Sequence, residues 1–212
     1  MRRPVQTPLD PSGLSAHLTP MFIQTEATPN PRTLKFLPGR DVLGQGSREF
    51  AHAHAASVSP LALALFAVEG VERVYLGGDF ITITKSEAIE WPHLKPHVLA
   101  AIMDHFTSGR PVLGAGGADE PADDEADIVY EGEAAGIVKE LKELIEARVR
   151  PAVARDGGDI TFHSWDHENG IVRLNMRGSC AGCPSSTLTL KQGIENMLRH
   201  YVPEVNAVEQ VV

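Results

Sequence analysis

The hydrophobic positions in the first half of the chain predict short strands. Apolar and polar residues alternate over residues 22–25 and 33–36, with a proline-rich turn between them. A second pair of alternating segments, residues 71–76 and 80–84, flanks a Gly-Gly pair that favours a tight hairpin turn. These four segments predict an antiparallel sheet.

Helical periodicity appears between and after these strands. Residues 48–56 and 61–67 are expected to form short helices, and apolar residues at helical spacing over 94–106 predict a longer amphipathic one. Together with the strands they predict a compact α+β domain over residues 21–108.

The last third of the chain predicts a second α+β domain over residues 136–212. A helix with one apolar face comes first, and Pro151 is expected to kink it before Gly157-Gly158 stops it. Alternating segments on either side of Asn169-Gly170 predict a hairpin. The hairpin strands are expected over 159–165 and 171–176, followed by a helix over 184–201 and an edge strand within 205–212. The apolar positions expected to face inward are, on the first helix, Ile137, Leu141, Leu144, Ile145 and Val149 and, on the second, Leu188, Ile194, Met197, Leu198 and Tyr201.

Composition separates these two domains. Residues 109–135 are expected to form a flexible acidic linker, because eight acids and no base lie between Asp119 and Glu133. The formal net charge is −9, so the rest of the chain is close to neutral. Residues 1–20 have neither an apolar signal core nor an Arg-rich helix and are expected to be a disordered extension, with Met21 as an alternative start. The predicted fold class is therefore two small α+β domains joined by a flexible linker.

The same composition excludes two classes of partner. No basic stripe is available for a nucleic-acid backbone, and no apolar run approaches the roughly 20 residues of a membrane helix. Because there are two close cysteines and no wider disulfide framework, we expect a reducing compartment, the cytoplasm or alternatively the mitochondrial matrix.

The chemistry of the chain is expected at its two cysteines, in the run Cys180-Ala181-Gly182-Cys183-Pro184. Proline suits the first position of a helix, and the unpaired N–H groups of a helix start favour thiolate at Cys183. The small residues around the pair allow backbone amides to approach the sulfurs or a bound inorganic cluster.

One chain supplies two of the four thiolates that a zinc site or a common iron–sulfur cluster requires. The other ligands must come from histidine, from a small thiol or from a second copy, and a symmetric dimer with an exposed site between the chains is the simplest answer. Three alternatives remain: an inert buried pair, a dithiol oxidoreductase, and a zinc site that uses His163 and His167.

Other polar residues favour ordinary structural roles. Two histidine pairs, His52 with His54 and His93 with His97, are expected on the surface. Asp156 and Asp159 flank the double glycine and are expected to be capping and turn residues rather than a catalytic pair. No Ser-His-Asp grouping, phosphate loop or dinucleotide motif appears in the sequence.

Two stretches resemble a known family. Asp156-Gly157-Gly158-Asp159 and the run from Gly178 to Glu195 closely resemble the C-terminal domain of the NifU family. Residues 24–31, with the Leu34-Lys35-Phe36 strand, resemble the amino-terminal domain of Nfu-type proteins.

This resemblance implies a late-acting carrier rather than an enzyme. In such a protein Cys180 and Cys183 of two chains bind one bridging 4Fe-4S cluster, and the loaded homodimer passes it to apo iron–sulfur proteins. The separate cysteine-bearing assembly domains of multidomain NifU proteins are missing from this sequence, so carriage is expected rather than cluster assembly.

Overall fold

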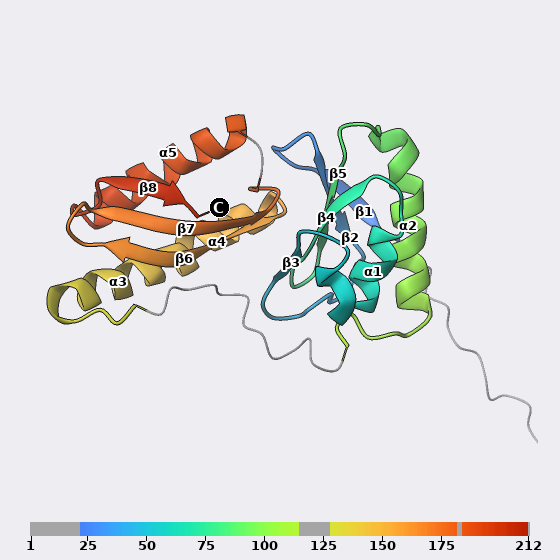
Figure 1. Cartoon of the computed structure of the whole chain (residues 1–212), viewed down its shortest axis with the longest axis horizontal. Helices are drawn as coiled ribbons and strands as arrows, with labels where there is room; N and C mark the ends of the chain where they lie inside the picture. Colours follow the sequence, from blue (N-terminus) through green and yellow to red (C-terminus); the bar gives the residue numbers. More distant parts are fainter. Residues whose placement is uncertain (1–21, 115–127, 182–183, 212) are drawn as a thin grey trace, which may run out of the picture.

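The computed structural model describes residues 22–114, 128–181 and 184–211. It contains two α+β domains, each with its own sheet and its own buried apolar cluster, as the sequence predicts. Figure 1 shows the C-terminal domain on the left and the N-terminal domain on the right, with the ends of β6 and β7 directed toward β4 and β5.

The N-terminal domain is an antiparallel sheet covered by helices. Its strand order is β1-β2-β5-β4-β3, and the expected hairpin forms its centre. The elements are β1 (Gln24–Ala27), β2 (Thr33–Leu37), β3 (Arg48–Phe50), the 3-10 helix η1 (Ala55–Val58), α1 (Pro60–Phe66), β4 (Val71–Leu76), β5 (Ile81–Lys85) and α2 (Trp91–Thr107).

Local signals fix the helices of this domain. Ser59 caps α1 by accepting a hydrogen bond from the Ala62 N–H, and Pro60 occupies the first turn, where its missing N–H costs nothing. Leu94, Val98 and Ile102 of α2 are buried against the sheet, as their spacing predicts. The last turn of α2 also buries His105 completely.

The expected helix over residues 48–56 is wrong. Arg48–Phe50 instead forms strand β3, which pairs antiparallel with β4 from Arg48 opposite Leu76 to Phe50 opposite Val74. The free edge of β4 offers unpaired backbone groups, and pairing with it outweighs the weak helical preference of this segment. At the other edge, β1 begins two residues later than expected and leaves Phe22 81% exposed.

The C-terminal domain has the predicted order of helix, strand, strand, cysteine-containing loop, helix and strand. Its three-stranded sheet has the order β6-β7-β8, with β8 parallel to β7. The elements are α3 (Gly132–Leu144), the π-helix η2 (Ile145–Val149), α4 (Arg150–Arg155), β6 (Gly158–Asp166), β7 (Ile171–Gly178), α5 (Pro184–Tyr201) and β8 (Ala207–Gln210).

The regular helix is interrupted near Pro151, as predicted: a π-helical turn precedes α4, and Pro151 lies in the first turn of α4. Two residues of α5 that are expected to face inward are exposed instead. Leu188 is 58% exposed rather than buried, because six helical residues place it about 120° around α5 from the buried Ile194. Tyr201 is 40% exposed, at the last residue of the helix, where its ring packs on Arg148.

The described ends of the predicted linker pack onto the two domains. Val112 and Leu113 lie against the N-terminal core, and the Gly114 N–H donates to the Val58 carbonyl. The Tyr130 hydroxyl accepts a hydrogen bond from the Trp165 N–H at 2.8 Å. The centre of the linker expected over 109–135 and the extension expected over 1–20 lie outside the described residues.

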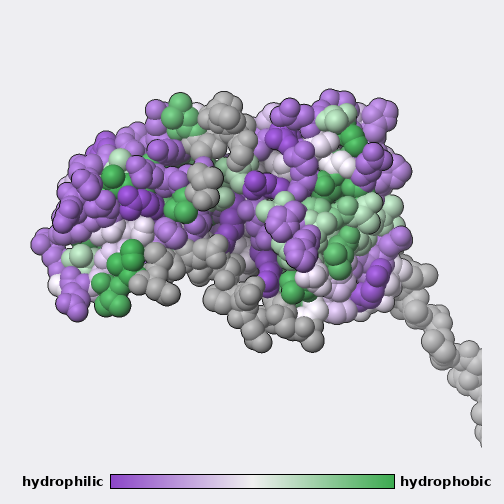
Figure 2. Space-filling view, viewed as in Figure 1, coloured by the Kyte–Doolittle hydropathy of each residue, from purple (hydrophilic) through white to green (hydrophobic). Residues whose placement is uncertain are grey.

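The surface in view differs between the domains. Figure 2 shows a mostly polar C-terminal domain, whereas apolar side chains gather over α1 of the N-terminal domain, where Leu63 is 43% exposed. Among the described residues, none of the helices has the length and apolar character that crossing a membrane requires.

Candidate functional site

The two cysteines belong to the loop between β7 and α5, here called the thiol loop (residues 178–183). Gly178 has a φ of 63°, a left-handed conformation that glycine adopts without strain. The next residues form tight turns, in which the Cys180 N–H donates to the Arg177 carbonyl and the Ala181 N–H to the Gly178 carbonyl. These bonds fix the position of Cys180 at the end of the sheet.

Cys180 is buried in the single chain, whereas the exposed site expected from the sequence lies between two chains. Its side chain is 6% exposed and belongs to the apolar cluster of the C-terminal domain, together with Ile160 and Met176. Burial raises the pKa of the Cys180 thiol to about 12, and the carboxylates of Asp156, Asp159 and Glu49 add to the rise while Ser179 opposes it. In this conformation Cys180 is held as a neutral thiol.

Gly158 allows the start of β6 to approach the sulfur. A Cβ atom on Gly158 would lie 2.6 Å from Cys180 Sγ and 2.9 Å from the Arg177 carbonyl oxygen. Only glycine fits there without moving the thiol loop, so the close backbone approach expected from the small residues of the loop is also provided by this strand.

Cys183 lies outside the described residues. The expectation that a helix start favours its thiolate concerns this residue and therefore stays a prediction. Pro184 is the first residue of α5, as predicted. The assignment of Cys180 and Cys183 as ligands therefore stays a prediction.

Asp159 has a larger role than the expected turn residue. Arg150 donates to both of its carboxylate oxygens, from Nε at 2.8 Å and Nη2 at 2.9 Å, and the Ser47 hydroxyl donates to Oδ2 at 2.7 Å. Burial on its own raises the pKa of Asp159, but these hydrogen bonds and the Arg150 charge hold it below its ordinary value. Asp156 matches the expectation, as the exposed C-cap of α4.

Two residues of the N-terminal domain contact the start of the loop at Gly178. Glu49 accepts a hydrogen bond from the Gly178 N–H at 3.1 Å, and burial raises the pKa of this carboxyl although that hydrogen bond and nearby arginines oppose the rise. The ring of Tyr75 lies against Gly178, and burial, with the charge of Asp159, raises the pKa of its phenol.

The histidines do not assemble a metal site with the described cysteine. His167 is exposed in the turn that follows β6, at the other end of this strand from Gly158, and His163 is half-buried. Within residues 22–114, 128–181 and 184–211, no group of three or more His, Cys, Asp or Glu side chains is arranged to hold a metal ion. This arrangement does not support the mixed Cys-His zinc site.

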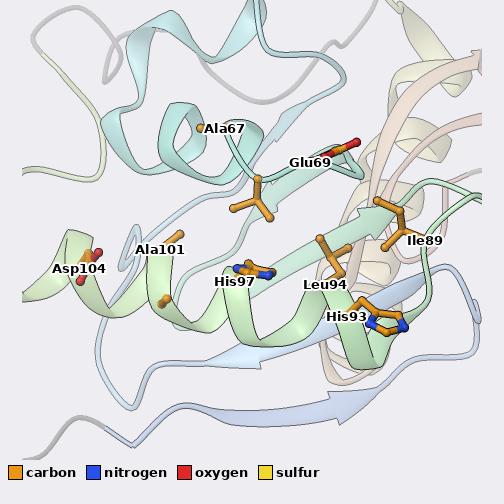
Figure 3. A pocket seen from close by; sticks show the side chains of 10 residues that line it. Ala67, Glu69, Ile89, His93, Leu94, His97, Ala101 and Asp104 are labelled. Carbon is orange, nitrogen blue, oxygen red and sulfur yellow. The ribbon is translucent and has the colours of Figure 1, made fainter.

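The other histidine pairs lie on the surface, as expected. His52 and His54 are exposed, although they lie in turns rather than in the expected helix. His93 and His97 of α2 line an open pocket of about 560 Å³ beside Leu94 and Ala67, with Asp104 at its far end (Figure 3).

Sequence reasoning missed the polar residues of the N-terminal domain that contact the C-terminal domain near the thiol loop. These residues are Asn30, Lys35, Ser47, Glu49 and Thr82. They are separated from their partners by 75 to 151 positions. Asn30 and Lys35 lie in the segments that resemble Nfu-type proteins, but nothing in that resemblance indicates a contact with the other domain. Periodicity places them on a sheet or in a turn but carries no signal for this contact.

Family models match both domains. Residues 23–109 match the model for "Scaffold protein Nfu/NifU N terminal", and residues 141–209 match the model for the "NifU-like domain". The second match contains the thiol loop.

Similar proteins cover almost the whole chain. The Arabidopsis thaliana "NifU-like protein 5, mitochondrial" is 50% identical over 190 residues, which are 90% of this chain and 68% of that protein. The Drosophila willistoni "NFU1 iron-sulfur cluster scaffold homolog, mitochondrial" is 52% identical over 209 residues, 98% of this chain and 70% of that protein. A solution structure of a NifU-like protein from Saccharomyces cerevisiae is 26% identical and covers 52% of this chain and 94% of that one, with a TM-score of 0.40.

Proposed function

Because the chain belongs to the Nfu/NifU family of scaffold proteins, we propose that it carries a 4Fe-4S cluster between two copies of itself and delivers it to apo-proteins. The observation that carries this proposal is the cysteine count. The chain has two cysteines, both in one loop between a strand and a helix, and this loop lies within the match to the NifU-like domain.

The ligand balance favours two chains. A 4Fe-4S cluster is usually held by four thiolates, and Cys180 and Cys183 of one chain supply half of them. A second copy supplies the rest through the same loop, which makes the contact isologous. The cluster is cargo, so a site shared between separable chains suits release better than a site closed inside one domain.

Delivery proceeds by exchange of thiolates. A cysteine thiol of the client loses its proton and bonds to an iron atom, while the bond from that iron to Cys180 or Cys183 breaks and the departing sulfur takes up a proton. Repeating this exchange moves the cluster with its iron and sulfide intact. No electrons are transferred and no catalytic side chain is needed, so the chain acts as a carrier rather than as an enzyme.

The compartment follows from the same relatives. Their names place them in mitochondria, which favours the mitochondrial alternative over the cytoplasmic expectation. Fractionation of the source cells with an antibody against the chain distinguishes the two.

The proposal is tested by anaerobic reconstitution of the full chain with ferrous iron and sulfide. We expect a brown protein with charge-transfer absorption, and its loss in both Cys180→Ser and Cys183→Ser. His163→Ala and His167→Ala serve as matched controls that keep the colour. A colourless protein that reduces insulin disulfides, or tightly held zinc that His163→Ala releases, would contradict the carrier function.

A further inference from the structure

The N-terminal domain forms hydrogen bonds with the thiol loop on both sides of Cys180. The Gly178 N–H donates to Glu49 Oε1 at 3.1 Å, and Asn30 Nδ2 donates to the Ala181 carbonyl at 3.3 Å. Ser179, Cys180 and Ala181 are all buried. The loop that must present a sulfur to an external ligand is therefore held against the chain's own first domain.

The contact continues along the chain segments that support the loop. Lys35 Nζ donates to the carbonyls of Ala154 and Arg155 at the end of α4, both at 3.1 Å, where a cation also suits the helix dipole. The Thr82 hydroxyl donates to the Gly157 carbonyl at 2.6 Å, and Ser47 donates to Asp159. Figure 1 shows these segments at the facing ends of the two domains.

The two surfaces fit closely. A Cβ atom on Gly157 would lie 2.9 Å from Thr82 Oγ1 and 3.3 Å from Lys35 Cβ, and one on Gly178 would lie 3.1 Å from the Tyr75 ring. The glycines of the C-terminal domain therefore present bare backbone to side chains of the N-terminal domain. Such a fit indicates a specific docking surface rather than a chance encounter.

This docking conflicts with a site shared between chains. For two thiol loops to face each other across a two-fold axis, the side chains that now contact residues 178–181 must leave. The Gly178 N–H, a donor that can stabilise cluster sulfur, is occupied by a carboxylate. A thiolate-bound cluster is also anionic, so the nearby charge of Glu49 opposes it.

We propose that the N-terminal domain covers residues 178–181 and their supporting segments in the cluster-free chain, through Asn30, Lys35, Ser47, Glu49 and Thr82, and is released when a second copy docks to share the cluster. This inference rests on the proposed carrier function, since release is linked to loading. The contact suits repeated opening because much of it consists of polar hydrogen bonds, for which water competes.

The closed contact is tested first without metal. In the full chain, nitrogen-15 relaxation should give one rotational correlation time for amides of both domains. In the double variant Glu49→Ala/Thr82→Val it should split into two shorter times as the domains tumble separately. The matched control Glu87→Ala/Thr107→Val, with an exposed glutamate and the last residue of α2, should behave as wild type.

Loading with ferrous iron and sulfide tests the link to the site. Because the cover reduces the fraction of competent chains, the double variant should reach half-loading at about tenfold lower iron and sulfide than wild type. In wild type, amide exchange in residues 28–35 and 46–50 should become faster on loading.

The outcomes separate this inference from the proposed function. Independent tumbling of the domains in the metal-free wild type overturns the cover. Equal loading of wild type and double variant, with exchange in the N-terminal domain unchanged, also overturns it and leaves the carrier function standing. Failure of both proteins to bind iron overturns the carrier function instead.

Discussion

Ser47 donates a 2.7 Å hydrogen bond to Asp159 across 112 positions of sequence. Ser47 lies just before the edge strand β3, and Asp159 lies at the start of β6, which supports the thiol loop. Both side chains are buried, and Arg150 of the C-terminal domain donates to the same carboxylate. The bond from Ser47 therefore joins the two domains close to the candidate site.

Asp159→Asn should destabilise the C-terminal domain by about 2 kcal/mol, because Arg150 loses a charged hydrogen-bond partner in a partly buried position. Urea unfolding followed by Trp165 fluorescence, in a Trp91→Phe background, measures it. Asp79→Asn, on an exposed turn, is the control and should stay within about 0.5 kcal/mol of its parent. A cost no larger than that of the control contradicts the role assigned to Asp159.

Acid should weaken the same contact. The pKa of Asp159 is lower in the folded chain than its ordinary value of 3.8, so its stabilisation is complete above that value and is lost as pH falls through the lower folded pKa. Wild type should therefore lose more stability than Asp159→Asn below about pH 4. The free energy of unfolding of the two proteins is measured over the same range of acid pH. An identical dependence on pH in both would contradict this role of Asp159.

His105 should make the N-terminal domain sensitive to mild acid. It is fully buried, its two ring nitrogens find no hydrogen-bond partner among the described residues, and burial, with the charge of Arg110, lowers its pKa. The folded state then binds fewer protons than the unfolded state, so stability is complete above the ordinary value of 6.5 and falls below it.

His105→Leu should remove this dependence and stabilise the domain by about 1 kcal/mol at neutral pH, because it replaces an unsatisfied polar ring by an apolar side chain. Urea unfolding at pH 7.5 and 5.5, followed by Trp91 in a Trp165→Phe background, checks it. His93→Leu, on the exposed side of α2, is the matched control. Equal pH sensitivity in His105→Leu and its parent would show that His105 is not the titrating group.

Gly157→Ala should open the domain contact. Gly157 has a φ of 80°, and the added methyl would meet Thr82 and Lys35, whereas Gly109 has a φ of 68° and a methyl group added there would have no neighbour within 4 Å. Both alanine variants should lose about 1 kcal/mol from backbone strain. Only Gly157→Ala should also let the two domains tumble separately, and the same tumbling in both variants contradicts the close fit.

The sequence predicted the elements whose periodicity is strong and whose partners are near in the chain. The hairpin of β4 and β5, the helix α2 and the order of the C-terminal domain follow from local patterns and turn residues. Strand β3 was mistaken for a helix because three residues carry little periodicity, and pairing with β4 decides their conformation.

The site was predictable only in part for the same reason. Spacing and small residues single out Cys180. Its burial, however, depends on the core beneath it and on the packing of the N-terminal domain, which is far away in the sequence. Ser47, Glu49 and Thr82 are ordinary polar residues until the fold places them against the thiol loop. Contacts of this kind are set by tertiary structure and leave no local pattern.

One chain provides half of the ligands of the proposed shared cluster. The most direct measurement is the iron and sulfide content of the anaerobically reconstituted full chain, taken together with its mass by light scattering. We expect a dimer with about four iron ions per two chains, and no iron in the double variant Cys180→Ser/Cys183→Ser. An iron-loaded monomer, or iron retained by that double variant, would contradict it.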